Sequence, residues 1–320
     1  MGDSLSTSKA REFDERGENE IDLRLVVASL WNKKWVIIIC TLFFAVASVF
    51  YALSLPDKYK SKAILSSSSS SGSSSLSRLA GQFGGLASLA GVNLGGGQST
   101  DKVSIAIELM KTWGFLEGFI IKQKLEVEIY AVNGWDKVNN RLLINNELYD
   151  SSLGKWREDE KNNSLKPTSW ELYQKLRANV SISQDKKNGL ISIGVEHYSP
   201  FVAKRMVDLL VGAINFHMQE QDKVEAINSI EYLKTQVGNT DIAEMRSIFY
   251  QLIEEQTKTL MLTQISDEYV FKTLSHAKVT EQKLKPNRTI IVAISIVVGV
   301  LFSFFLVFVL HLSSKVKEPD

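Results

Sequence analysis

The chain has 320 residues, a formal net charge of +1 and a single cysteine. This length fits one soluble domain of ordinary size with membrane anchors, and the balanced charge gives no basic excess for binding nucleic acid. Because Cys40 lies inside an apolar run, the sequence excludes disulfides and cysteine metal sites from the remaining chain.

Two long apolar segments lie near the ends of the chain. Residues 35–55 carry no charged side chain, and residues 290–312 are interrupted only by His311 near the end. A bilayer core requires about 20 helical residues, so both segments are predicted to span a membrane. The alternatives are a buried core helix for either segment and a cleaved signal peptide for the first. The length of the first run and the charged segment before it favour an uncleaved anchor.

The flanking charges give the expected orientation. Basic residues stand outside the two spans at Lys33, Lys34, Lys315 and Lys317, and inside them at Lys58, Lys60, Lys62, Lys283, Lys285 and Arg288. The positive-inside rule weighs short loops and largely ignores long translocated domains. We therefore expect both termini, residues 1–34 and 313–320, on the cytoplasmic side.

The first part of the chain combines a membrane-entry helix, a strand and a segment of simple composition. Apolar residues from Ile21 onward predict a short amphipathic helix, with Trp31 and Trp35 as interfacial anchors. Residues 59–65 read as a strand. The Ser/Gly-rich stretch 66–97 is either a flexible linker or a small-residue helix packed on a neighbour, and the sequence leaves both open.

Helical spacing returns at residues 102–124, with expected interruptions at Gly114 and Gly118. Polar loops are expected around Asn133 and Gly134 and over residues 151–168, and a short helix over 170–177. Alternating apolar residues at 180–183 and 190–193 enclose Asn188-Gly189. This pattern is typical of a β-hairpin, because Asn and Gly accept the backbone angles of a tight turn.

A long helical segment follows. Ser199 is expected as the N-cap and Pro200 as the first helical residue, with helix to about Val237 and again over 241–263. The pair is polar around much of its circumference and predicts an extended stalk. Its apolar stripe is expected to pack within the stalk or against partner subunits, through Leu210, Ile214, Ile227, Ile230 and Leu233.

The sequence carries none of the common catalytic motifs. There is no GxxxxGK[ST], no HExxH and no GxSxG, and Gly95–Gly97 is interpreted as linker. His197 beside Glu196 is interpreted as half of a surface pair. We expect no catalytic, cofactor-binding or metal-binding residues, and a protein that is not an enzyme but works by binding and assembly.

Several fragments, in this order and between two spans, resemble the Wzz-type chain-length determinants, which are polysaccharide co-polymerases. The fragments are Glu20–Leu23, Pro56–Tyr59, Ser199–Ala203, Leu260–Leu262, Tyr269–Phe271 and Pro286–Arg288. The chain departs from the family in its prolines. Only Pro286 remains before the second span, where Ser275, His276 and Thr280 stand at positions that often read as Asp-Pro and Pro.

The resemblance implies an α+β fold in which two transmembrane helices flank a periplasmic domain with a mixed α/β base beside the membrane and a long helical trunk. The expected parts, in sequence order, are a tail (1–34), helix 1 (35–55), a periplasmic domain (56–289), helix 2 (290–312) and a tail (313–320). Within the domain, the base is expected at 56–198 and 266–289 and the trunk at 199–265. Trp31, Trp35, Pro286, Arg288 and Gly299 are expected to anchor and pack the membrane spans.

The resemblance also implies a function in the inner membrane of Gram-negative bacteria. Such proteins form rings, here expected to be octamers, that control how many repeat units a Wzy-type polymerase adds to lipid-linked (undecaprenyl) O-antigen of lipopolysaccharide. No cofactor and no nucleic acid is implied. Two alternatives stay open: a capsule or exopolysaccharide co-polymerase with a separately encoded tyrosine kinase, and a two-span periplasmic sensor. A tail of about eight residues after helix 2 gives no room for a kinase or an output domain.

Overall fold

The computed structural model describes residues 34–68 and 98–315, and it divides them into two compact units. One unit contains the helices at the two ends of the chain, and the other spans Pro56–Lys285. The expected entry helix with Trp31, most of the Ser/Gly-rich stretch and Gly95–Gly97 lie outside the described residues.

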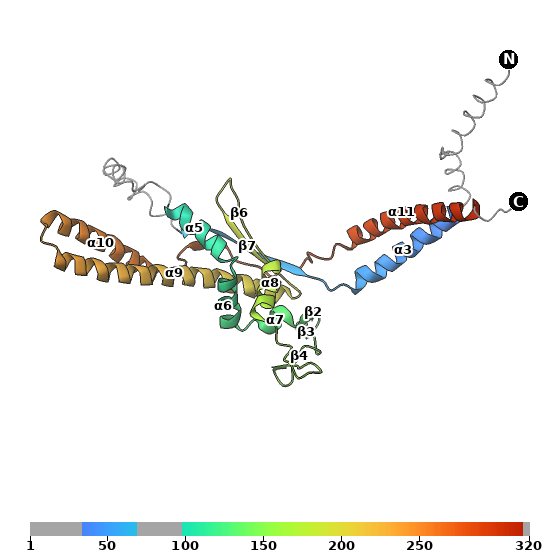
Figure 1. Cartoon of the computed structure of the whole chain (residues 1–320), viewed down its shortest axis with the longest axis horizontal. Helices are drawn as coiled ribbons and strands as arrows, with labels where there is room; N and C mark the ends of the chain where they lie inside the picture. The colour runs from blue at the N-terminus through green and yellow to red at the C-terminus, as the bar shows by residue number, and fades with distance from the viewer. Residues whose placement is uncertain (1–33, 69–97, 316–320) are drawn as a thin grey trace, which may run out of the picture. The chain divides into compact units, whose positions relative to one another are not determined.

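The first unit is a pair of helices, α3 (Lys34–Ser54) and α11 (Arg288–Lys315). Both are long and apolar enough to cross a membrane, and most of their apolar side chains are exposed. The two helices lie side by side (Figure 1). Exposed apolar side chains all along a helix are typical of a surface that faces lipid rather than water.

The centre of the second unit is a four-stranded antiparallel sheet of order β6-β7-β1-β8. Its strands are β1 (Tyr59–Ser67), β6 (Val180–Gln184), β7 (Ile191–His197) and β8 (Phe271–Ser275). The predicted hairpin is confirmed: β6 and β7 are joined by a turn in which Gly189 takes a φ of +70°. Side chains alternate along β7, so Ile191, Ile193 and Val195 are buried on one face.

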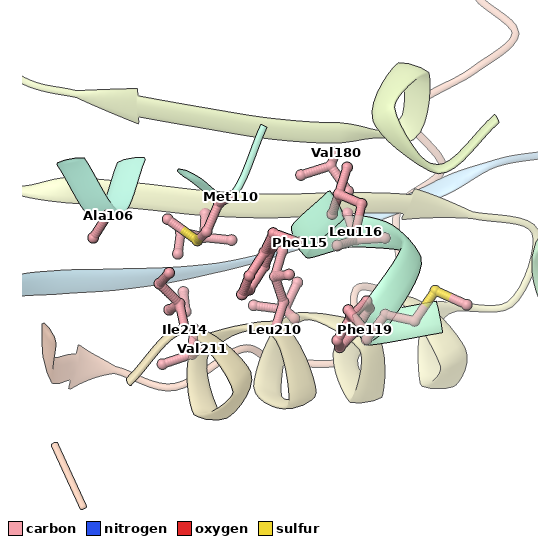
Figure 2. Close-up of a cluster of buried hydrophobic side chains, with 14 of the residues drawn as sticks. Ala106, Met110, Phe115, Leu116, Phe119, Val180, Leu210, Val211 and Ile214 are labelled. Atoms are coloured by element: carbon pink, nitrogen blue, oxygen red, sulfur yellow. The ribbon is translucent and has the colours of Figure 1, made fainter. Parts of the chain in front are cut away.

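Helix α9 (Pro200–Asn239) packs its first half on that buried face. Helices α5 (Gln98–Leu109), α6 (Trp113–Gln123) and α8 (Ser169–Asn179) complete the core. Figure 2 shows side chains converging on one apolar cluster. They include Phe115, Leu116 and Phe119 of α6, Leu210 and Ile214 of α9, Met110 just after α5 and Val180 at the start of β6. A single contiguous core holds this unit together.

Two small sheets and a short helix, α7 (Glu126–Tyr130), complete the unit. The sheets are β2 (Val132–Asp136) with β3 (Arg141–Ile144), and β4 (Tyr149–Asp150) with β5 (Lys155–Trp156). The prediction of a loop at Asn133-Gly134 is therefore wrong. Gly134 lies in β2 beside a register shift, where a Cβ atom would come within 3.3 Å of the Leu143 side chain.

One further expectation needs correction, and another is confirmed with a different capping bond. The helix over 102–124 does break, but before Gly114: α5 ends at Leu109, and the Thr112 side chain caps the start of α6 by accepting from the Phe115 N–H. Ser199 is the N-cap of α9, as expected, but its side chain makes no cap hydrogen bond. Its backbone N–H donates instead to Nδ1 of His197, at 3.0 Å.

The second half of α9 leaves the core and pairs with α10 (Ala243–Ile265) as an antiparallel helical hairpin (Figure 1). A helix of 40 residues is about 60 Å long, so α9 serves both the core and the hairpin. We call residues 219–265 the trunk hairpin. The fold is thus the expected α+β arrangement, with two candidate membrane helices at the ends and a base and a trunk between them.

Candidate functional site

The trunk hairpin has almost no core of its own. Along residues 219–265, the buried side chains are Ala226 and Thr263. Large apolar side chains are exposed on both helices: Val224, Ile227, Tyr232, Met245, Ile248, Tyr250, Leu252, Met261, Leu262 and Ile265. An amphipathic helix gains most of its stability by burying its apolar face, so this surface is suited to a protein partner.

The structure separates the five residues of the predicted trunk stripe into two groups. Leu210 and Ile214 are fully buried in the core of their own chain (Figure 2), so they are not available to a partner. Ile230 and Leu233 are half-buried, and Ile227 keeps 44% of its surface exposed. Of the five, Ile227 is thus the one that offers an exposed contact.

A row of polar side chains on α9 holds the chain where it returns from the trunk. The Asn215 side chain accepts from the N–H groups of Val270 and Phe271, at 3.0 and 2.8 Å, and donates to the Phe271 carbonyl at 2.9 Å. One turn on, the Gln219 amide donates to the carbonyls of Thr263 and Ser266. The row ties the end of α10 and the start of β8 to α9.

Asp222 ends this row. Its carboxylate accepts from the Tyr269 hydroxyl at 2.6 Å and from the Lys102 ammonium at 2.7 Å. Burial, together with the hydrogen bond to Asp222 and its negative charge, raises the pKa of Tyr269. Tyr269 therefore stays protonated at neutral pH and donates to Asp222.

We expect Asn215→Leu to destabilise the base strongly, because it leaves two backbone N–H groups and one carbonyl buried without partners. Each such group costs about 1–3 kcal/mol. Thermal unfolding of the full chain in detergent should show a midpoint many degrees lower. Asn228→Leu is the matched control, since Asn228 is exposed on the same helix. Similar midpoints for the two variants would contradict the role of Asn215.

The two apolar helices approach closely at Gly299. A Cβ atom on Gly299 would lie 3.0 Å from the Phe44 Cβ and 3.5 Å from the Thr41 Cα. Ser48 and Ala52 of α3 and Ser303 of α11 are also buried. Small residues let membrane helices approach closely enough for extensive van der Waals contact.

The remaining predicted anchors lie at the ends of these helices. Trp35 is 68% exposed near the start of α3, as an interfacial side chain would be. The guanidinium of Arg288 donates to the Ala52 carbonyl near the end of α3, at 3.1 Å. Pro286 comes two residues before α11, where its missing N–H leaves no helical bond unmade. Arg288 therefore satisfies a carbonyl that the last turn of α3 leaves open.

A small cavity of about 30 Å³ opens in the base, between α8, the end of β7 and the start of β1. Its lining includes two lysines, Lys58 and Lys175, and two carboxylates, Glu128 and Glu196. Glu196 pairs with Lys285 at 2.8 Å and Glu128 with Arg205, so both carboxylates already have cationic partners.

His197 forms one wall of this cavity and is buried, so its interpretation as a surface residue is wrong. Its Nδ1 accepts from the Ser199 N–H, which leaves Nε2 to donate to the Glu128 carbonyl at 3.0 Å. These two bonds require the neutral ring. Burial lowers the pKa of His197, outweighing the attraction of Glu128, and Lys58 lowers it further.

The lowered pKa of His197 determines how the stability of the folded protein changes with pH. Since the pKa of His197 is lower in the folded protein, the unfolded chain takes up the proton first. His197 then favours the folded state above the ordinary value of 6.5 and loses this contribution as the pH falls below it. The slope is at most about 1.4 kcal/mol per pH unit. We expect the midpoint of thermal unfolding to fall less between pH 7.5 and pH 5.5 in His197→Asn than in wild type. An equal fall in both proteins would contradict this role of His197.

Over the described part of the chain, no group of three or more His, Cys, Asp and Glu side chains is arranged to hold a metal ion. The features described above are suited to binding. They are the exposed apolar trunk hairpin, the closely packed pair α3 and α11, and the basic cavity in the base.

Sequence reasoning missed the residues that build the return from the trunk and the cavity. Asn215 and Gln219 did leave a signal, because they are polar residues four apart next to the apolar Ile214 and Met218. Lys58 and Lys175 left no local signal in the sequence, because 117 positions separate them in the chain.

Residues 19–123, about a third of the chain, match the family model "Wzz: Chain length determinant protein". The match includes α3, β1, α5 and α6, and it confirms the resemblance that the sequence indicated. Comparison with curated proteins gave no match.

Two of the solved structures found are polysaccharide co-polymerases. A full-length bacterial polysaccharide co-polymerase is 11% identical, with a TM-score of 0.40 over 94% of this chain and 100% of that one. A fragment of WzzB, a polysaccharide co-polymerase from Salmonella Typhimurium, is 10% identical, with a TM-score of 0.30 over 72% of this chain and 100% of that one. Neither similarity is close enough to carry a structural argument.

Proposed function

We propose that the chain is a non-catalytic regulator of O-antigen chain length in lipopolysaccharide biosynthesis. The observation that carries this proposal is the trunk hairpin, which leaves many large apolar side chains exposed on both of its helices. The chain length determinant pattern over residues 19–123 supports it. The exposed apolar surface of the trunk hairpin and the chain length determinant pattern together favour one function. In it, copies of the chain assemble with one another and so regulate polymer length.

The proposed assembly is a ring of copies of this chain, with eight as the expected number. The trunk hairpin of one copy covers apolar side chains on its neighbour, as in a closed ring with repeated interfaces. The helices α3 and α11 hold the ring in the inner membrane, with residues 56–289 in the periplasm and both termini in the cytoplasm. There the ring acts on a Wzy-type polymerase that extends the lipid-linked glycan.

The experiment is a deletion of the gene, with lipopolysaccharide, capsule and exopolysaccharide measured in the same strain. We expect the lipopolysaccharide ladder to lose its preferred length while polymer is still made. An unchanged ladder would contradict the proposal. Loss of capsule or exopolysaccharide, with the ladder unchanged, would assign the chain to the alternative co-polymerase pathway instead.

A further inference from the structure

The cavity in the base contains two ammonium groups whose charges no carboxylate balances. Lys58 Nζ donates to the Asn179 side-chain carbonyl at 3.3 Å and lies 5.3 Å from the centre of the Tyr198 ring. Lys175 Nζ donates to the Tyr130 carbonyl at 3.0 Å and lies 4.6 Å from the centre of the Tyr130 ring. All of these partners are neutral.

The carboxylates that line the cavity do not supply the missing charge. Glu128 is paired with Arg205, and Glu196 with Lys285 and, at 4.0 Å, with Lys60. Five cationic groups therefore surround two carboxylates, which leaves a local excess of three positive charges. Within the described chain, Lys58 and Lys175 form no ion pair.

The two lysines also repel each other. Burial lowers the pKa of Lys175, and the positive charge of Lys58 lowers it further. Two like charges held close in a half-buried site raise the free energy of the empty site, and a bound anion removes this cost. Both lysines are held in place, Lys58 by the backbone bonds between its strand and Lys285, and Lys175 by helix α8.

The size of the cavity and its place in the chain indicate which anion it would take. A volume of about 30 Å³ has space for roughly two or three water-sized groups, since a single water requires about 10–15 Å³, and this suits two or three oxygens of one phosphate group. Lys58 follows the last residue of α3 by four positions, and four residues reach at most about 14 Å. Ammonium groups bind phosphate through charge-assisted hydrogen bonds.

We propose that Lys58 and Lys175 form a binding site for a phosphate group presented at the membrane surface. The phosphate has two possible sources, the headgroup of an anionic phospholipid and the diphosphate that links a polyprenyl lipid to its glycan. The second source rests on the proposed function, whereas the site itself rests only on the cavity and its charges.

The test uses the full chain in phosphatidylcholine nanodiscs, with inorganic diphosphate as the first probe. We expect diphosphate to bind and to raise the midpoint of thermal unfolding. The double variant Lys58→Gln/Lys175→Gln should bind it at least about ten-fold more weakly, because it loses both charge-assisted hydrogen bonds to the anion. The double arginine variant at the same positions should retain binding.

The matched control is Lys186→Gln/Lys187→Gln, which removes the same charge from the exposed turn between β6 and β7. It should bind diphosphate like wild type. Without ligand, the Lys58→Gln/Lys175→Gln variant should unfold at the same temperature as wild type or higher, because the repulsion is gone. Equal binding by this variant and wild type, or equal weakening in the control, would overturn the proposal.

Two further arms identify the source. Nanodiscs that contain phosphatidylglycerol, and others that contain a polyprenyl diphosphate, are compared by their ability to displace labelled inorganic diphosphate. Displacement by phosphatidylglycerol assigns the site to the lipid headgroup, and displacement by the polyprenyl diphosphate alone assigns it to the glycan carrier. If neither lipid displaces the labelled diphosphate, the proposal that the ligand is presented by the membrane is overturned. These binding results do not depend on the lipopolysaccharide ladder, so the site and the proposed function can fail separately.

Discussion

Replacement of Ile227 by aspartate is expected to break apart the proposed ring of copies while each copy stays folded. Ile227 is exposed on the trunk hairpin, so its loss changes the stability of a single copy by only about 0.5 kcal/mol. At a subunit interface, a buried charge in place of an apolar anchor costs about 2 kcal/mol or more at each contact. In a ring this cost recurs at every interface, which makes the expected effect large.

Mass photometry or native mass spectrometry of the purified full chain measures this outcome. Wild type is expected as one closed assembly and Ile227→Asp as single copies or short fragments of a ring. Asn228→Asp serves as the control, because it adds the same charge at the neighbouring exposed position without removing an apolar side chain. An intact ring in the Ile227→Asp variant would exclude this face of α9 from the interface.

Gly299→Leu is expected to force the two membrane helices apart. Even a Cβ atom at this position would come to 3.0 Å from the Phe44 Cβ, so the additional carbons of leucine have no space. Overpacking of this kind typically costs about 1–3 kcal/mol. The variant should unfold at a lower temperature in detergent and should lose control over chain length.

A disulfide provides a direct readout of this packing. In a Cys40→Ser background, Phe44→Cys/Gly299→Cys should cross-link on oxidation. The two Cβ atoms would start at 3.0 Å, so a small outward shift brings them to the spacing of about 3.5–4.5 Å that a disulfide needs. Val298→Leu is the control for the leucine variant, because it places a leucine at the neighbouring exposed position. Failure of the cross-link, or equal destabilisation by both leucines, would contradict the close approach of α3 and α11.

The parts of the fold that the sequence predicted are those with local signals. The turn of the β6–β7 hairpin requires a glycine at positive φ, and Pro200 marks the first turn of α9 within one position. The two apolar helices follow from length and hydropathy alone. In each case a few neighbouring residues determine the structure, so one sequence is sufficient.

The parts that the sequence could not predict depend on contacts between distant residues. Strand β1 pairs with β7 and β8, both more than a hundred positions away, and no local pattern encodes that choice. Thr280 illustrates the same point. Its hydroxyl donates to the Lys60 carbonyl at 2.6 Å, and so it holds the returning chain on β1.

The apolar stripe of α9 shows why periodicity misassigned partners. Leu210 and Ile227 share one helical pattern, yet the first is buried in the core of its own chain and the second is exposed. A helix of 40 residues crosses from the core into the trunk, and the spacing of its apolar residues does not change at that point. Periodicity identifies an apolar face but not what covers it.

The role of trunk assembly is tested most directly by the lipopolysaccharide ladder of a null strain that carries, in turn, wild type, Ile227→Asp and Asn228→Asp at equal membrane levels. We expect a preferred chain length with wild type and Asn228→Asp. With Ile227→Asp we expect a ladder that falls off smoothly, as in the null strain. A preferred length retained by a variant shown to be unassembled would contradict the claim that the chain sets polymer length by assembly of its trunk.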